Sequence, residues 1–120
     1  MTGRVDSAGR ALLSISLKPS ATAPAVEIEA WVDTGFTGEL VLPQDRIVAL
    51  HLPQSAAVRV ALGDGSETVL NTYSCVIEWL SQDKPIEVIA NTGQFPLLGV
   101  GLLQDQTLTI DYGSRTLTIV

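Results

Sequence analysis

The chain has 120 residues, of which 46% are hydrophobic and 17% charged, and its formal net charge at pH 7 is −6. This length fits one domain with a substantial core, and the apolar content excludes a disordered chain. The seven Lys and Arg residues are scattered, so no basic stripe exists to neutralise phosphates or to bind an anionic membrane surface. We therefore expect neither nucleic acid nor a membrane among its partners.

No apolar run approaches the roughly 18 residues of a membrane span, and residues 1–10 lack the apolar centre of a signal peptide. We expect a cytoplasmic protein in which residues 1–120 form one domain and residues 1–10 are flexible. The single Cys75 excludes an internal disulfide and, with the single His51, argues against a metal site. Cys75 lies in a strand-like stretch and is predicted to be buried, whereas His51 is predicted to be solvated.

The first half of the chain predicts strands at 11–17, 26–32 and 39–42 and a short helix at 44–50. Leu13, Ile15 and Leu17 alternate with polar residues, as in a half-buried strand. The Pro-punctuated segment 19–24 predicts that the first two strands form a hairpin. Pro43 suits the start of the helix.

The second half predicts strands at 58–62, 68–80, 85–89, 106–111 and 115–120, with a short helix at 99–104. A strong hairpin signal lies between the first two of these strands, in the residues Gly63, Asp64, Gly65 and Ser66. Seven or more short strands with one or two short helices predict an all-β fold, a closed or nearly closed barrel of mainly antiparallel strands.

One motif stands apart from this framework, in the stretch Val32-Asp33-Thr34-Gly35-Phe36-Thr37-Gly38. An acid directly after an apolar strand costs free energy unless it is hydrogen-bonded, paired or used. Thr34 supplies a hydroxyl to tie the turn, and Gly35 permits a backbone conformation that a side chain would forbid. The stretch therefore predicts a carboxylate held rigidly at a strand end. The simpler interpretation is an aspartate that caps a turn.

This D-T-G stretch, followed by a Gly-containing hairpin and then by Pro96-Leu97-Leu98-Gly99-Val100-Gly101-Leu102-Leu103, resembles the retropepsin-like aspartic proteases over residues 13–119. The resemblance implies a pepsin/retropepsin-type single lobe with an acid-protease-like barrel. It implies catalytic roles for Asp33, Thr34 and Gly35, and a floor formed by Leu98 and Gly99. The 63–66 hairpin matches the family's flap in chain order, although any β-hairpin would have the same sequence pattern.

Aspartic proteolysis needs two neighbouring carboxylates that share a proton. The chain has one D-T-G, and Asp111, the nearest rival, has Tyr112 in place of the hydroxyl residue, so it is expected to accept turn hydrogen bonds. The second carboxylate must then come from a second copy, in a two-fold homodimer that cleaves a peptide or protein substrate without metal or organic cofactor. In the family, the residue equivalent to Thr34 bonds across the axis.

Three interpretations stay open at this point. The first is an aspartic endopeptidase, the second is a catalytically silent dimer of the same fold that binds a peptide or partner strand, and the third is a purely structural dimer. Side-chain pockets are expected near Val32, Leu62, Val69 and Leu98. The chain departs from the family at Phe36, where small residues are frequent, and at Gly101, where an acid is often found.

Overall fold

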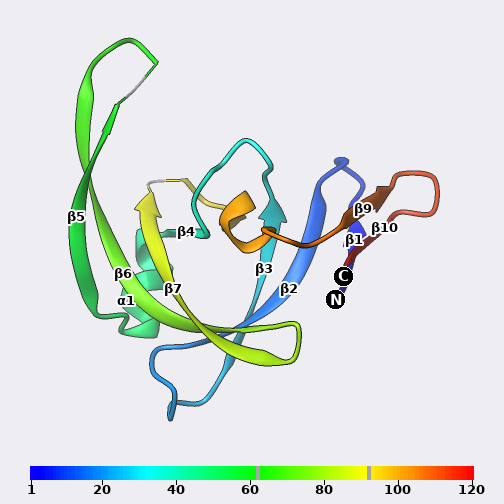
Figure 1. Ribbon diagram of the computed structural model, residues 1–120, viewed down its shortest axis with the longest axis horizontal. Coiled ribbons are helices and arrows are strands. Elements are labelled where there is room, and N and C mark those ends of the chain that lie inside the picture. The colour runs from blue at the N-terminus through cyan, green and yellow to red at the C-terminus, as the bar shows by residue number, and fades with distance from the viewer. Residues whose placement is uncertain (62, 92) are drawn as a thin grey trace.

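The protein is described by a computed structural model that covers residues 1–61, 63–91 and 93–120 (Figure 1). Leu62 and Thr92 lie outside the described residues. The elements in chain order are β1 (Thr2–Val5), β2 (Ala11–Lys18), β3 (Val26–Val32), β4 (Leu40–Pro43), α1 (Gln44–Leu50), β5 (Gln54–Ala61), β6 (Glu67–Trp79), β7 (Gln82–Asn91), β8 (Leu97–Leu98), the 3₁₀ turn η1 (Val100–Leu102), β9 (Leu108–Asp111) and β10 (Thr116–Ile119).

The strands form one sheet in the order β5-β6-β7-β4-β8-β3-β2-β1-β10-β9. An additional antiparallel pairing between β6 and β2, with Leu17 opposite Ile77, joins two strands that are distant in this order. The pairing closes β6, β7, β4, β8, β3 and β2 into a ring around a common core. The all-β fold class predicted from the sequence is therefore confirmed, and the ring is the closed barrel.

Alternation along the strands explains which side chains fill this ring. On β2, Leu13, Ile15 and Leu17 are buried, while Ser14 between them is exposed. On β6 the alternating residues Tyr73, Cys75, Ile77 and Trp79 are all buried, so the burial predicted for Cys75 is confirmed. Strands with one face on the core and one in water have this period of two.

Two parallel strand pairings determine the geometry around the end of β3. β3 lies parallel to β8, with Val32 opposite Leu98, and β4 lies parallel to β7. Parallel neighbours require long crossover connections, and here these connections bring residues 97–98 next to the end of β3. This contact joins segments that are more than 60 residues apart in the chain.

The N-terminal segment forms an ordered part of the sheet. We expected residues 1–10 to be flexible, but β1 (Thr2–Val5) is hydrogen-bonded between β10 and β2. The terminal amine of Met1 also donates to the carbonyl oxygen of Ile119 at 2.9 Å. The segment is polar because its outward residues face water. The strand is too short for an alternation of polar and apolar residues to predict it.

The remaining elements differ from the predictions mainly at their ends. Helix α1 has the predicted bounds, whereas the helix predicted at 99–104 is the single 3₁₀ turn η1. β5 begins four residues earlier than predicted, and β5 and β6 form a long hairpin that projects from the barrel (Figure 1). No helix among the described residues is long and apolar enough to cross a membrane.

Candidate active site

Asp33 lies directly after β3, in a loop held by three hydrogen bonds. Its backbone N–H donates to the carbonyl oxygen of Leu98 at 2.8 Å, which continues the β3–β8 pairing by one residue. Its carboxylate Oδ1 accepts the N–H of Gly35 at 2.9 Å, and its carbonyl oxygen accepts the N–H of Phe36 at 3.2 Å. The side chain is partly exposed. The carboxylate is thus rigidly placed and still open to water.

Leu98 and Gly99 lie beneath this loop. The Leu98 side chain is fully buried in the core. The N–H of Gly99 donates to the carbonyl oxygen of Glu39 at 2.9 Å, and the next N–H, of Val100, donates to that of Phe36 at 2.8 Å. The loop after β3 therefore rests on the segment after β8 through backbone bonds at both of its sides.

Close packing between the Asp33 loop and the segment after β8 explains Phe36 and Gly101, the two residues that depart from the pattern described above. A Cβ atom at Gly99 would overlap the carbonyl oxygen of Gly38 and the ring of Phe36, and a Cβ at Gly38 would overlap the same ring. Gly101 donates its N–H to Gly38 at 2.9 Å, and a Cβ there would lie 2.8 Å from that carbonyl oxygen. An aromatic ring at position 36 fits because glycines surround it.

Thr34 lies at the surface of the loop, next to Asp33. Its side chain is exposed, and within the described residues its hydroxyl has no hydrogen-bond partner. The hydroxyl is adjacent to Asp33 and Gly35 in the loop. It is therefore available to a group outside this chain.

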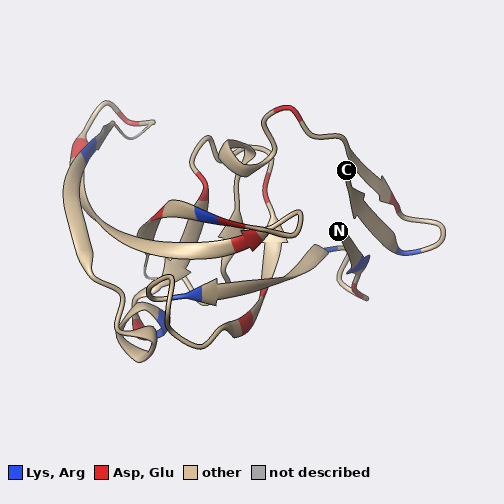
Figure 2. Ribbon diagram, turned by 60° about the horizontal axis from the view of Figure 1, so that its bottom comes forward, with Lys and Arg blue, Asp and Glu red and all other residues tan. Residues whose placement is uncertain are grey.

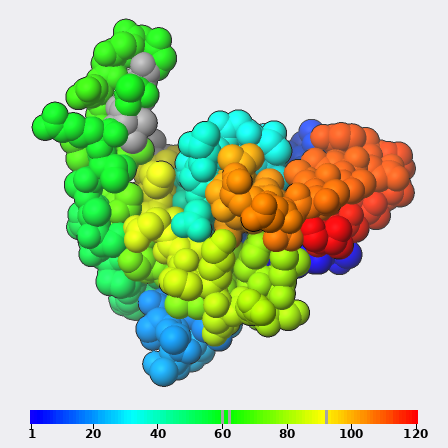
Figure 3. Space-filling view, viewed as in Figure 1, coloured from blue at the N-terminus to red at the C-terminus, as the bar shows by residue number. Residues whose placement is uncertain are grey.

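The predicted flap residues Gly63, Asp64, Gly65 and Ser66 form the tip of the β5–β6 hairpin, which stands above the barrel (Figure 3). Asp64 Oδ1 accepts the hydroxyl of Ser66 and also its N–H, the latter at 2.9 Å. The hydroxyl of Ser66, followed by the Ser66 N–H, holds the pKa of the Asp64 carboxyl below its usual value. Gly65 has a φ of +86°, which a side chain would strain. The tip is thus a tight turn on a long, projecting hairpin.

A cleft of about 770 Å³ separates the hairpin from the Asp33 loop. The loop contributes one wall, β6 the opposite wall, and β4 and β7 the base; its lining residues are Gly35, Phe36, Thr37, Gly38, Val41, Gln44, Val69, Leu70, Asn71, Ile89, Ala90 and Asn91. Val69 lines this cleft as predicted. Leu98 is buried and lines no cavity described here, and the predicted Leu62 lies outside the described residues. The surface that lines the cleft is mainly apolar, with the side-chain amides of Gln44, Asn71 and Asn91 among the lining groups.

A smaller hollow of about 380 Å³ lies beside Asp33 and is lined by Trp31, Val32, Asp33, Thr34 and Leu97. Trp31 is 39% exposed, and its ring meets Phe95 edge-on with centroids 6.1 Å apart. The Arg10 guanidinium lies 4.6 Å from the Phe95 ring centroid. This cluster was not predicted from the sequence, although an aromatic residue that faces outward two positions before the acid was an available signal.

Asp33 is the only acid among the residues that line the cleft and the hollow. Asp111, the other candidate, accepts the N–H groups of Gly113 at 2.9 Å and of Ser114 at 3.0 Å, so the predicted turn role is confirmed. The basic residues are scattered along the chain rather than clustered (Figure 2). A second carboxylate for Asp33 is therefore not supplied by the cavities of the same chain.

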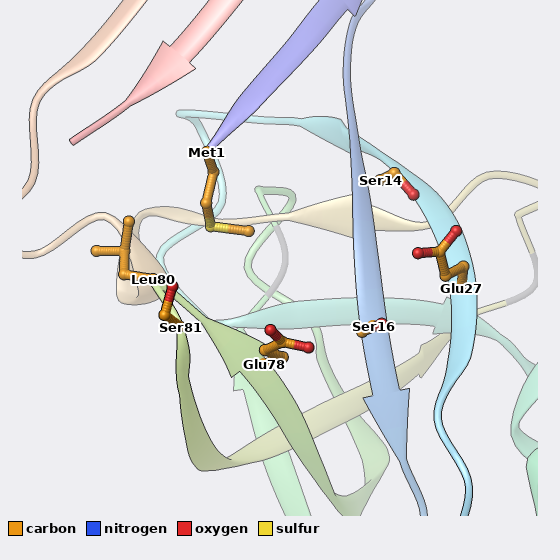
Figure 4. Close-up of a pocket in the computed structure, with 7 residues that line it drawn as sticks. All are labelled: Met1, Ser14, Ser16, Glu27, Glu78, Leu80 and Ser81. Carbon is orange, nitrogen blue, oxygen red and sulfur yellow. The ribbon is translucent and has the colours of Figure 1, made fainter.

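Another cavity, of about 440 Å³, is lined by Met1, Ser14, Ser16, Glu27, Glu78, Leu80 and Ser81 (Figure 4). Ser16 of β2 pairs with Glu27 on one side and with Glu78 on the other, which places both carboxylates on this cavity. None of the predicted site residues lines it. Among the described residues, no group of three or more His, Cys, Asp or Glu is placed to hold a metal ion.

Cys75 and His51 have the positions predicted for them. Cys75 is buried, and burial, with smaller contributions from Glu39 and Glu87, raises the pKa of its thiol to about 12. His51 is exposed at the C-terminal end of α1, with a φ of 54°. Neither residue lines the cleft or the hollow beside Asp33.

The barrel, the floor and the projecting hairpin together define a retropepsin-like fold. The chain is similar to a retropepsin-like aspartic protease from Rickettsia conorii, with 17% identity and a TM-score of 0.68 over 100% of this chain and 86% of that one. It is also similar to the EIAV protease in complex with the inhibitor HBY-793, with 15% identity and a TM-score of 0.58 over 80% and 86% of the two chains. No protein-family description and no curated protein matches the sequence. At these identities the likeness establishes the fold.

Proposed function

We propose that the protein is an aspartic endopeptidase that works as a homodimer, with one Asp33 from each copy at the two-fold axis. The observation that carries the proposal is the position of Asp33: a partly exposed carboxylate, fixed by the N–H of Gly35 and the floor at Leu98, on a retropepsin-like fold. A turn-capping aspartate would explain the bond to Gly35. It would not explain a cleft and a hollow that open on either side of the loop.

In the proposed reaction, the two Asp33 carboxylates share one proton, because like charges in contact cannot both ionise. The ionised carboxylate takes a proton from a water molecule while the water oxygen attacks the peptide carbonyl carbon. The protonated carboxyl gives its proton to the carbonyl oxygen. The C–N bond of the tetrahedral intermediate then breaks as the carboxyl that took the water proton gives it to the leaving nitrogen, and a hydroxyl of the intermediate returns its proton to the other carboxylate. This reaction uses no metal and no organic cofactor.

The cleft supports binding of an extended peptide between the Asp33 loop and the β5–β6 hairpin. Its apolar walls, formed by Phe36, Val41, Val69 and Ile89, would take side chains of the substrate. The flap residues Gly63 to Ser66 would cover the peptide, with main-chain hydrogen bonds adding it as a strand. The substrate class is therefore a peptide or an unfolded segment of a protein.

Thr34, Gly35, Leu98 and Gly99 have supporting roles in this proposal. The Thr34 hydroxyl, which has no hydrogen-bond partner within the described residues, would bond across the axis to the loop of the second copy. Gly35 would keep the backbone close beneath the two carboxylates. Leu98 and Gly99 would hold the loop in place from below. A cytoplasmic location is part of the same proposal.

A second candidate is a catalytically silent dimer that binds a peptide or a partner strand. The residues that line the cleft and the hollow include one acid, so each copy alone can bind a peptide but needs the carboxylate of a second copy for hydrolysis. The candidates differ in what they require of Asp33. Binding tolerates its replacement by Asn, whereas hydrolysis does not.

The deciding experiment is cleavage of a diverse peptide library at pH 4 to 7 and high protein concentration. We expect cuts by the wild type that fall by about 10²–10⁴-fold in Asp33→Asn and disappear with a statine-type inhibitor. Asn can still accept the Gly35 N–H, so the fold should be kept. Asp45→Asn, an exposed acid in the first turn of α1, is the matched control and should cut as the wild type does. Full activity in Asp33→Asn would disprove the assignment, and binding without cuts from a proven dimer would favour the second candidate.

A further inference from the structure

The β5–β6 hairpin leaves the barrel at Thr72 (Figure 1). From Thr72 downward β6 pairs with β7, whereas above Thr72, in the described part of the sheet, it pairs with β5 alone. The register of β5 shifts at the same level, between Gln54 and Ala56, so that Ser55 has no partner residue on β6. A bulge of this kind bends the strand that carries it. Ser55 and Thr72 thus form the root of the hairpin, where its angle to the barrel is set.

Two hydroxyl groups and a carboxylate meet at this root. Ser55 Oγ lies 2.6 Å from Glu87 Oε2 and 3.0 Å from Thr72 Oγ1. The shorter distance is typical of a hydroxyl that donates to an ionised carboxylate. Because Ser55 gives its one hydroxyl proton to Glu87, the bond between the two hydroxyls must be donated by Thr72. These three side chains therefore form a directed relay from Thr72 through Ser55 to Glu87.

Burial of Thr72 makes this relay necessary. Thr72 is 5% exposed, and a buried hydroxyl without a hydrogen-bond partner is costly. Its other acceptor within the described residues is the carbonyl oxygen of Ala56, which lies farther away, at 3.3 Å. The Ser55 hydroxyl is therefore the main acceptor for Thr72, and Glu87 keeps that hydroxyl turned the right way.

Glu87 is linked in turn to the floor of the Asp33 loop. Its backbone N–H donates to Glu39 Oε1 at 3.1 Å. The carbonyl oxygen of Glu39 accepts the N–H of Gly99 at 2.9 Å, which is one of the bonds that hold the loop on its floor. A series of hydrogen-bonded residues thus connects the floor with the root of the hairpin, through Glu39 and Glu87.

The electrostatic surroundings show that both carboxylates belong to this connection. Glu39 and Glu87 lie close enough to Cys75 to help raise the pKa of its thiol, after the larger effect of burial. Within the described residues neither carboxylate forms an ion pair with Lys, Arg or His. Their protein partners are the Ser55 hydroxyl and the N–H of Glu87. A glutamate that served solubility alone would not need these partners.

We propose that Glu87 and Ser55 are positioning residues, which hold the β5–β6 hairpin at a fixed angle over the cleft by linking its root to the floor of the Asp33 loop. Neither residue lines the cleft or the hollow beside Asp33, so both act through the hairpin rather than on a ligand. Thr72 and Glu39 complete the link at its two ends. The consequence for substrates rests on the proposed function, in which a peptide lies between the hairpin and the loop.

The angle of the hairpin can be measured in the ligand-free protein by residual dipolar couplings of the backbone N–H groups. In the wild type, we expect the couplings of residues 67–71, above the root, and of residues 73–79, in the barrel, to fit one alignment tensor. Ser55→Ala interrupts the relay at its centre, so the couplings of residues 67–71 should shrink while those of residues 73–79 stay the same. Couplings of full size at residues 67–71 in Ser55→Ala would overturn the proposal, as would reduced couplings there in the wild type.

Two further variants separate the relay from a general effect of substitution. Ser55→Thr keeps the hydroxyl and should keep the wild-type couplings. Ser14→Ala is the matched control, because it removes an exposed hydroxyl of β2 that makes no hydrogen bond within the described residues. An equal loss of couplings in Ser14→Ala and Ser55→Ala would count against the proposal.

A double-mutant cycle tests the end of the link at the floor. Glu39→Leu removes the acceptor of the Glu87 N–H and should also reduce the couplings of residues 67–71, whereas Glu39→Gln keeps an acceptor and should not. Because both changes interrupt one series, adding Glu39→Leu to Ser55→Ala should cause little further loss; residues of one network show such non-additive effects. Unchanged couplings in Glu39→Leu, or strictly additive losses, would overturn the link to the floor.

The effect on a substrate is measured by the split between KM and kcat. A hairpin that samples several angles binds a peptide only in its competent fraction, so the apparent affinity falls by that fraction. Ser55→Ala should raise KM about two- to tenfold, the equivalent of one net hydrogen bond, and leave kcat unchanged. A fall in kcat at unchanged KM would overturn the positioning role. A wild type that cleaves no peptide rejects the proposed protease, and the dipolar couplings then support or overturn the link without it.

Discussion

The backbone N–H of Asp33 donates to the carbonyl oxygen of Leu98 at 2.8 Å, although 65 positions separate the two residues. This bond extends the parallel pairing of β3 with β8 by one residue beyond Val32. It places the candidate catalytic acid above a fully buried leucine, and the position of the carboxylate thus depends on the core of the barrel. Substitutions beneath the loop should therefore affect both stability and the site.

Gly99→Ala is expected to lower the free energy of unfolding by about 1–3 kcal/mol, the usual cost of overpacking. The new Cβ would overlap the carbonyl oxygen of Gly38 and the ring of Phe36, and backbone atoms cannot move aside cheaply. Urea unfolding measures the loss. Gly63→Ala is the control, since no atom lies within 4 Å of a Cβ at that position. A Gly99→Ala variant as stable as this control would contradict the packing described for the floor.

Thr34→Val should leave the fold of each copy intact and weaken the dimer. The hydroxyl is exposed and makes no hydrogen bond within the described residues. The free energy of unfolding of the monomer should therefore change by about 0.5 kcal/mol or less. The dimer dissociation constant should rise about tenfold or more, as bonds across the axis are lost. Thr34→Ser keeps the hydroxyl and should behave as the wild type in sedimentation. An unchanged dissociation constant in Thr34→Val would argue against a cross-axis role.

Cys75 should be almost unreactive in the folded protein. Burial is the main cause that raises the pKa of its thiol from 9.0 to about 12, so at pH 8 the thiolate is about a thousand times scarcer than in the unfolded chain. Alkylation by iodoacetamide should be slow in buffer and fast in urea. Rapid modification of the folded protein would show that the β6 strand opens easily.

The same raised pKa makes stability depend on pH above 9. Between pH 9 and 12 the unfolded chain loses the Cys75 proton while the folded chain keeps it, so unfolding releases a proton and the free energy of unfolding falls as pH rises. Urea midpoints at pH 8 and pH 10.5 measure the fall. Cys75→Ala provides the comparison, because its midpoint should decrease less over this interval.

The Asp64 carboxyl should titrate below its ordinary pKa of 3.8. The turn at the hairpin tip should lose order as this carboxyl becomes protonated. The Ser66 hydroxyl and N–H both stabilise the carboxylate and lower its pKa. Since the folded pKa is lowered, the stabilisation of the turn is present above the ordinary value and is lost as the pH falls through the folded value.

The Ser66 amide resonance reports this titration by NMR. Its chemical shift should move with an inflection below pH 3.8, and the movement should vanish in Asp64→Asn, whose side-chain oxygen can still accept the N–H. An inflection above pH 3.8 would mean that the turn stabilised by these hydrogen bonds does not form in solution.

The sequence determined those features that depend on local pattern. Alternation along β2 predicted its buried face, Pro43 and the apolar spacing predicted α1, and the acid after an apolar strand predicted a carboxylate at a strand end. Each follows from the period of a strand or helix, or from the cost of burying a charge, and both act within a few residues. The order of the D-T-G, hairpin and L-L-G segments also indicated the fold that the structural likeness establishes.

The tertiary structure decided which distant segments meet. No local pattern in residues 1–10 predicted that β1 would fill the place between β2 and β10, and none predicted the closure of the barrel by β6 on β2. The packing of Phe36 against Gly38 and Gly99 likewise joins segments whose separate sequences give no sign of contact. Strand pairing is a choice among many partners of similar propensity, and it is settled by the shape of the whole core rather than by any one strand.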